Sequence, residues 1–177
     1  MTVADIISQT QHKMGRTIET LREDFTKIPG GLPGVETTII AGYNRRLYDR
    51  LAGKYEHVEV LGYTDRVYEY MSRSDLMLSK PGGITLFETI FSELPILAWE
   101  PFLEQEKKNA RFLVRPGIGR IAAKEAGACL EVIRTLIYDD DALRAMAGNM
   151  RRMKGALEHE SLSRIMSAAI GARGVCA

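Results

Sequence analysis

The sequence predicts an α/β fold in which helices flank a parallel sheet, followed by a helical C-terminal tail. Short apolar runs rich in β-branched residues alternate with amphipathic runs up to about residue 122, and the pattern is helical from residue 126 onward. Strands that alternate with helices at this spacing form βαβ units, which make parallel sheets. The 177 residues are 45% hydrophobic and 27% charged, which fits one folded domain with a sizeable core.

Five runs are expected to be strands because they are short, apolar and rich in β-branched or aliphatic residues. In chain order they are Val35–Ala41, Val58–Leu61, Asp75–Ser79, Pro95–Trp99 and Gly119–Ala122. Gly42 and Gly62 end the first two, and Lys80 opens the loop after the third. Ligands of open parallel sheets bind where strands end, near the point at which the strand order reverses. The loops after these strands are therefore the candidates for ligand binding.

Four helices are expected between the strands, and a longer helical region follows them. Asn44 is placed to cap the first helix, and Pro116 and Gly117 break the fourth. The expected helices are 45–51, 67–72, 85–92, about 105–114 and the region 126–172. Within that last region, apolar residues recur at helical spacing from Leu130 to Ile137 and from Leu143 to Met153, which predicts two core-facing stripes.

Charge and cysteine content exclude several classes of function. With 24 basic and 23 acidic side chains, the net charge is +1, which argues against a dedicated nucleic-acid binder. Cys129 and Cys176 lack CxxC spacing, so we expect ordinary thiols in a reducing compartment rather than a disulfide framework or a metal site. The sequence shows no signal peptide and no run of about 18 apolar residues, so a soluble cytoplasmic domain is expected.

The segment Ser79–Glu88 carries the first functional motif, Lys80-Pro-Gly-Gly-Ile-Thr85-Leu-Phe-Glu88. Here a strand ends, two glycines allow close approach of the backbone, and a helix begins. A helix N-terminus offers unpaired N–H groups and partial positive charge, and Lys80 adds a full charge, so the segment favours a cradle for a diphosphate. Two structural interpretations remain open, because Thr85-x-x-Glu88 fits a capping box and Pro-Gly-Gly fits an ordinary tight turn.

A second polar cluster, at 101–110, follows the expected strand Pro95–Trp99. Gln105, Glu106 and Asn109 fall in the first turns of the expected helix, with Gln105 and Asn109 on one face. Amides and carboxylates suit the hydroxyl groups of a sugar, which both donate and accept hydrogen bonds. The alternative is a solvated helix start that carries acids near its positive end.

Other polar residues form less specific patterns. Asp139-Asp140-Asp141 contains an Asp-x-Asp triplet, which binds a metal in some enzymes, but acids between two helical stretches also cap the second helix, and capping is the preferred interpretation. His12, His57 and His159 are scattered without metal-binding spacing, and no GxSxG, GxxxxGK[ST] or complete GxGxxG motif occurs. We therefore expect no metal and no cofactor.

Four segments occur in a specific order and spacing. They are Gly62-Tyr63, the run from Ser74 to Glu88, Leu94-Pro95, and the run Glu104-Gln-Glu-Lys-Lys-Asn-Ala110. Together they resemble the donor-binding half of GT-B glycosyltransferases, over about residues 14–121. The likeness is strongest to the group that contains the monogalactosyl- and processive glucosyl-diacylglycerol synthases and MurG, the peptidoglycan-precursor N-acetylglucosaminyltransferase. This resemblance implies a Rossmann-like lobe.

The resemblance implies a UDP-sugar site and a role for each matching residue. Tyr63 and Thr64 are implied to contact uracil, and Glu88 is implied to contact the ribose. The residues implied to hold the diphosphate are Lys80, Gly82, Gly83 and Thr85. The residues implied to lie near the hexose are Gln105, Glu106 and Asn109. Gly15 resembles the end of a phosphate-binding loop. The resemblance also implies an inverting transfer, in which an acceptor hydroxyl attacks the anomeric carbon and the nucleoside diphosphate leaves.

The resemblance also predicts how the chain is divided. Residues 1–13 are expected to be a degenerate or replaced first strand and loop, 14–122 the UDP-sugar-binding domain, and 123–177 its helical C-terminal segment. The acceptor-binding lobe, which carries the general base in the family, has no counterpart here. It is therefore an implied partner, as a missing lobe or a separate subunit, and this chain alone is expected to be inactive.

The implied acceptor is a lipid, either diacylglycerol or a polyprenyl-linked precursor, with diacylglycerol preferred. The complete enzyme would then work at the inner face of the membrane as a peripheral protein, with no nucleic-acid partner. Two other functions stay open: a non-catalytic nucleotide-binding or interaction lobe, including one subunit of a split glycosyltransferase, and a UDP-sugar epimerase. The sequence leaves the transferred sugar undetermined.

Overall fold

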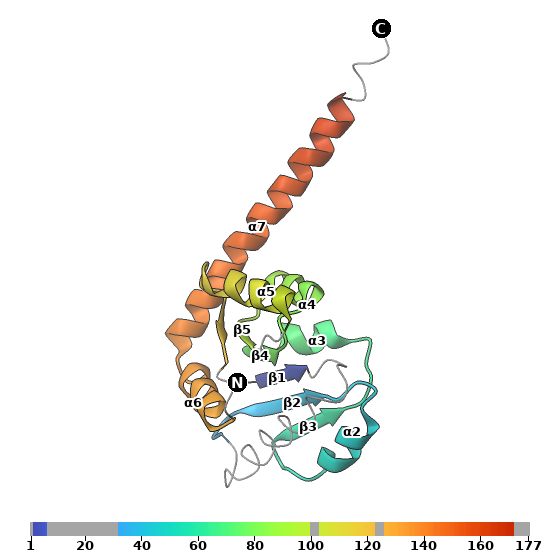
Figure 1. Cartoon of the computed structure of the whole chain (residues 1–177), viewed down its shortest axis with the longest axis vertical. Coiled ribbons are helices and arrows are strands. Elements are labelled where there is room, and N and C mark those ends of the chain that lie inside the picture. The colour runs from blue at the N-terminus through green and yellow to red at the C-terminus, as the bar shows by residue number, and fades with distance from the viewer. Residues whose placement is uncertain (1, 7–31, 100–102, 123–125, 172–177) are drawn as a thin grey trace.

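The computed structural model describes residues 2–6, 32–99, 103–122 and 126–171. Within these residues, six strands form one sheet in the order β3-β2-β1-β4-β5-β6 (Figure 1). The strands are β1 Thr2–Ile6, β2 Glu36–Ile40, β3 Val58–Leu61, β4 Leu76–Ser79, β5 Ile96–Ala98 and β6 Gly119–Ile121. Every neighbouring pair is parallel, so all six carboxyl ends lie along one edge of the sheet. The predicted parallel α/β architecture is confirmed.

The strand β1 lies at the centre of the sheet, where the sequence predicted none. Val3 is in register with Thr37 of β2 on one side and with Leu76 of β4 on the other. The expectation for residues 1–13 was a degenerate or replaced first strand and loop, and residues 2–6 do form a strand at that position. The run Thr-Val-Ala-Asp-Ile is short and carries an acid, so its own pattern is weak. Backbone pairing on both sides determines the strand, and the local sequence does not reveal that pairing.

Six helices are described, and they cover both faces of the sheet (Figure 1). They are α2 Arg45–Leu51, α3 Val67–Ser72, α4 Gly83–Phe91, α5 Glu104–Val114, α6 Ala126–Ile137 and α7 Asp140–Gly171. On one face, α4, α5 and Met150 of α7 pack against Ile96 and Ala98 of β5. On the other face, α6 and the start of α7 pack against Leu97 and Trp99. Because successive strand residues point to opposite faces, β5 is buried on both sides.

The long helix α7 extends beyond the sheet and the other helices (Figure 1). It begins at the acidic triplet, where Asp139 Oδ1 accepts a hydrogen bond of 2.9 Å from the Ala142 N–H. Asp140 and Asp141 both pair with Arg144, at 3.7 and 2.8 Å. The capping interpretation of the triplet is thus confirmed. None of the helices described, α7 included, combines the length and the apolar character needed to cross a membrane.

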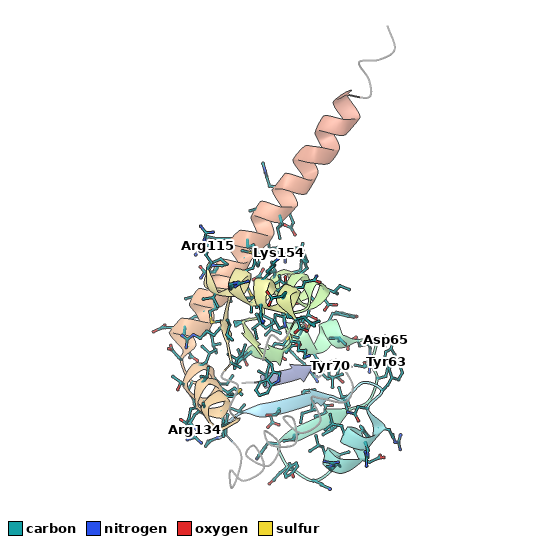
Figure 2. The ribbon with its side chains drawn as sticks, in the orientation of Figure 1. Tyr63, Asp65, Tyr70, Arg115, Arg134 and Lys154 are labelled. Carbon is teal, nitrogen blue, oxygen red and sulfur yellow. The ribbon has the colours of Figure 1, made fainter. Side chains whose placement is uncertain are left out.

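An ionic contact joins the turn after α4 to α7. The carboxylate of Glu93 lies 2.7 Å from Arg151 and 3.6 Å from Lys154, a residue labelled in Figure 2. The hydrogen bond from Arg151, together with the charges of both cations, holds the pKa of Glu93 below its ordinary value. Glu93 also has a φ of 55°, a left-handed conformation that is unusual for a residue with a side chain. In this turn, Glu93 therefore has a strained backbone conformation, and its ion pairs with α7 help to hold the residue in that conformation.

Candidate functional site

The carboxyl edge of the sheet brings together the loops that the sequence singled out. The strand β1 pairs with β2 on one side and with β4 on the other, so the strand order reverses between β1 and β4. In open sheets of this order, ligands bind outside the carboxyl ends at the reversal. The loops after β2, β3 and β4, which begin near Gly42, Gly62 and Lys80, therefore border the candidate site.

The helix α4 begins directly after the Lys80-Pro-Gly-Gly loop, with Gly82 as its N-cap and no side chain capping it. The Gly82 N–H donates to the Lys80 carbonyl at 2.8 Å, which is the tight turn that Pro-Gly-Gly favours. Because the helix starts at Gly83, Thr85 and Glu88 lie within it and the capping-box interpretation is wrong. Among the residues that the structure describes, a Cβ on Gly83 would meet no atom within 4 Å outside its own helix backbone and chain neighbours. These residues therefore leave the first turn of α4 open to a ligand.

Lys80 and Glu106 form an ion pair between the two sequence motifs. Lys80 Nζ lies 3.9 Å from Glu106 Oε1, and the two side chains are only 17% and 12% exposed. The other carboxylate oxygen of Glu106 accepts a hydrogen bond of 3.1 Å from the Leu103 N–H at the start of α5. A largely buried pair is held more firmly than a surface pair because solvent screens it less. The cation of Lys80 is thus fixed at the carboxyl edge, beside the start of α4.

A second contact joins the same two motifs. The side-chain amide of Asn109 donates a hydrogen bond of 2.8 Å to the carbonyl oxygen of Pro81, across 28 residues of sequence. Asn109 and Glu106 are partly buried, whereas Gln105 is exposed. The structure therefore brings together Lys80, Glu106 and Asn109, three of the residues that the resemblance implied for one site, and leaves Gln105 at the surface.

A pair of stacked tyrosines follows β2 and β3. The rings of Tyr43 and Tyr63 have centroids 4.6 Å apart and planes 16° from parallel. Gly42 has a φ of 57°, and its carbonyl oxygen lies close to Gly62. The loops after β2 and β3 therefore run close together, which places Tyr43 and Tyr63 side by side. Partial desolvation and the neighbouring Tyr63 raise the pKa of Tyr43 above its ordinary value. Figure 2 shows Tyr63 and Asp65 together at this edge.

Sequence reasoning missed Tyr43, although a signal for it was present. The same dipeptide, Gly-Tyr, follows two neighbouring strands of the sheet, at Gly42-Tyr43 and at Gly62-Tyr63. Parallel neighbours end at the same edge, so a repeated dipeptide after two such strands predicts that the two side chains meet. The strand order needed for this inference was known only from the structure.

The remaining predicted residues lie on the same edge or outside the described chain. Thr64 Oγ1 accepts a hydrogen bond of 3.1 Å from the Arg66 N–H, which leaves the Thr64 side chain occupied within its own loop. Thr85 is partly buried and Glu88 is exposed, both on α4. Gly15 lies outside the described residues, so its role in phosphate binding stays a prediction.

The sequence is similar to those of curated bacterial glycolipid synthases. It is 35% identical over 125 residues to the processive diacylglycerol beta-glucosyltransferase of Staphylococcus carnosus, covering 69% of this chain and 32% of that protein. It is 33% identical over 150 residues to the enzyme of the same name from Bacillus subtilis, covering 82% and 38%. The chain is therefore similar to one part of the processive diacylglycerol glucosyltransferases. It spans about a third of their length, and no family model matches it.

Solved structures of low sequence identity share the fold. HepE from Anabaena, in complex with UDP, superposes with a TM-score of 0.63 at 19% identity, over 94% of this chain and 48% of that one. A putative UDP-N-acetylglucosamine 2-epimerase from Listeria monocytogenes gives a TM-score of 0.64 at 10% identity, over 82% and 38%. The fold is therefore that of one Rossmann-like lobe of the GT-B architecture, which both transferases and epimerases use.

Proposed function

We propose that this chain is the donor-binding lobe of an inverting hexosyltransferase that uses a UDP-sugar and a lipid-linked acceptor. The observation that carries the proposal is the uncapped start of α4 with the Lys80–Glu106 ion pair beside it, at the reversal of the strand order. Similarity to the processive diacylglycerol glucosyltransferases supports the reaction class and favours diacylglycerol as the acceptor. The chain spans about a third of those enzymes, so it would supply one wall of the cleft.

The diphosphate would bind at the start of α4. The N–H groups of the first turn and the helix dipole favour an anion there, and Gly82 and Gly83 let phosphate oxygens approach the backbone. Lys80 would contribute a full positive charge to this cradle. These groups stabilise the negative charge that develops on the departing UDP, which lowers the barrier to transfer because the groups are already oriented before the reaction.

The nucleoside would extend from this cradle toward the loop after β3. There the backbone at Tyr63 and Thr64 would read the edge of uracil, and Glu88 on α4 would accept hydrogen bonds from the ribose hydroxyls. Gln105 and Asn109 on α5 would lie near the transferred hexose, with Glu106 at the junction between hexose and phosphate. UDP in the structure of HepE, which has the same fold, supports a uridine nucleotide as the ligand.

The general base would come from a second lobe, either a preceding part of a longer protein or a separate subunit. It would deprotonate the acceptor hydroxyl, which attacks the anomeric carbon from the face opposite UDP and inverts its configuration. A lipid acceptor implies that the complete enzyme works as a peripheral protein at the inner face of the membrane. We expect no transfer from the 177 residues alone, because the proposed general base lies on the second lobe.

Calorimetric titration of the chain with UDP, with ADP and GDP as controls, tests the proposal. We expect selective binding of UDP, loss of binding in Glu88→Ala and weaker binding in Lys80→Ala. A folded chain that binds none of the three nucleotides would contradict a donor lobe. Adding an acceptor lobe from a relative then separates a working enzyme from a non-catalytic lobe. Transfer of hexose to diacylglycerol supports the enzyme, and hexose epimerisation without any acceptor would identify an epimerase.

A further inference from the structure

Two large aromatic rings remain in solvent at the carboxyl edge of the sheet. Tyr43 is 67% exposed and Tyr63 is 62% exposed, although the two rings stack on each other. Aromatic residues usually bury most of their surface in a core or an interface. Both backbones are constrained by the close approach of the Gly42 and Gly62 loops, so the pair is held in place while its outer surface is left uncovered.

The position of the pair follows from the strand order. The diphosphate cradle lies after β4 and the uracil-reading loop lies after β3, with β1 and β2 between them. Three strand spacings of about 4.8 Å each separate these two loops by roughly 14 Å. A nucleotide with its diphosphate on α4 and its base at Tyr63 must therefore pass over the end of β2, where Tyr43 lies.

We propose that Tyr43, stacked on Tyr63, is the aromatic platform against which the base of the nucleotide donor packs. This inference rests on the proposed function and adds a residue to its site. A pyrimidine base has two apolar faces, and an aromatic side chain binds such a face regardless of which sugar is attached. The edge of the base would be read by the backbone at Tyr63, whereas Tyr43 would supply contact area and hold the base in its plane.

Another exposed tyrosine provides a matched control. Tyr68 on α3 is 66% exposed, but its hydroxyl lies 3.3 Å from its neighbour Glu69 and its ring is not stacked on Tyr43 or Tyr63. A substitution there removes a similar exposed ring without changing the stacked pair. An effect on UDP affinity that follows from losing any exposed tyrosine will then appear in the variants at Tyr43 and at Tyr68. An effect that follows from losing the stacked ring will appear only in the variant at Tyr43.

The test compares the affinities of Tyr43→Leu, Tyr43→Phe and Tyr68→Leu in the full chain for UDP and for inorganic pyrophosphate. We expect Tyr43→Leu to weaken UDP binding roughly 10-fold, equivalent to about 1.4 kcal/mol. Pyrophosphate binding should be unchanged, because that ligand has no base. Tyr43→Phe keeps the ring and should retain UDP affinity within about 2-fold, as should Tyr68→Leu. Far-ultraviolet circular dichroism establishes that every variant is folded.

The outcomes separate this inference from the proposed function. If the unsubstituted chain binds UDP and Tyr43→Leu binds it equally well, the platform is wrong while the donor lobe stands. Equal weakening of UDP and pyrophosphate in Tyr43→Leu would also overturn the platform, because the loss would then lie in the phosphate cradle. Binding of neither ligand by the unsubstituted, folded chain would overturn both proposals together.

Discussion

The side-chain amide of Asn109 on α5 donates a 2.8 Å hydrogen bond to the carbonyl oxygen of Pro81, in the loop that leads into α4. Pro81 is buried, so this carbonyl depends on a protein donor rather than on water. The bond therefore holds the loop that is proposed to bind the diphosphate against α5, which carries the residues proposed to lie near the hexose. A change on α5 is expected to alter the geometry of the loop as well as its own contacts.

Replacing Asn109 by Ala should lower both stability and affinity. Loss of the bond leaves the Pro81 carbonyl without this donor, at a cost of about 1–2 kcal/mol in the free energy of unfolding, measured by urea denaturation. The affinity for UDP should fall at least about 3-fold. Asn149→Ala is the matched control, because Asn149 donates an equivalent 2.9 Å bond to the Gly117 carbonyl away from the site. Equal loss of UDP affinity in both variants would count against a local role for Asn109.

The Lys80–Glu106 pair predicts a specific result for a double substitution. Lys80→Met should weaken UDP binding by roughly 10- to 100-fold and lower stability by about 1–3 kcal/mol, because it leaves the Glu106 carboxylate largely buried without its cation. Adding Glu106→Gln removes the negative charge that Lys80 neutralised, so the double variant should regain stability without regaining affinity. Thermal unfolding and calorimetry measure the two quantities. Recovery of UDP affinity in the double variant would show that the charge of Lys80 does not bind the diphosphate.

Gly83→Ala should separate folding from binding. The added Cβ meets no protein atom within 4 Å, so the free energy of unfolding should change by less than about 1 kcal/mol. The same methyl group projects into the space beside the first turn of α4, and UDP binding should weaken about 5-fold or more. Gly155→Ala on α7, where a Cβ is equally unhindered, should leave UDP affinity unaltered. If Gly83→Ala binds UDP normally, the phosphates do not approach α4 closely.

The ion pairs of Glu93 predict how stability depends on pH. The pKa of Glu93 is lower in the folded chain than its ordinary value of 4.5, so its charge stabilises the fold at higher pH, and this contribution is lost as the pH falls below that value. Glu93→Gln should therefore lower the free energy of unfolding at neutral pH, by up to about 1 kcal/mol, and the difference from the unsubstituted chain should vanish in acid. Urea unfolding at several pH values measures this difference. A constant difference at all pH values would exclude the charge as its source.

The backbone at Glu93 adds a separate effect. A residue with a side chain pays a conformational penalty of about 1 kcal/mol in the left-handed region, and glycine does not. Glu93→Gly should therefore be more stable than Glu93→Ala by about that amount, since both variants lack the ion pairs. Thermal unfolding of the two variants at neutral pH measures it, and equal stabilities would mean that the turn relaxes when the carboxylate is removed.

Most of the sheet could be predicted because five of its strands carry their own signal. Leu76–Ser79 and Ile96–Ala98 are continuous apolar runs buried on both faces, so the local pattern and the fold agree. The first strand, Thr2–Ile6, has no such run, and its place depends on partners in β2 and β4 that are distant in sequence. A local sequence pattern therefore identifies a strand more readily when burial of its side chains determines it than when backbone pairing with distant strands does.

The candidate site could be predicted in part for a similar reason. The resemblance implied one donor site for Lys80, Glu106 and Asn109, and the structure brings these three residues together. The partner of each side chain was not predictable, because the pairing of Lys80 with Glu106 depends on how α5 packs beside the loop. Tyr43 was missed because its importance arises only when β2 and β3 are known to be neighbours.

The central position of β1 has a consequence for synthesis of the chain. This strand is synthesised before β2 and β4, and its Val3 pairs with Leu76, more than seventy residues later. Until β4 has been made, β1 can pair only with β2, and the sheet cannot close around it. Such long-range pairing slows folding. Nascent chains in which β1 is late to insert expose the facing edges of β2 and β4, and bare strand edges of this kind recruit other chains. We therefore expect a low yield of folded protein when the chain is expressed rapidly, and a higher yield when it is synthesised more slowly at low temperature.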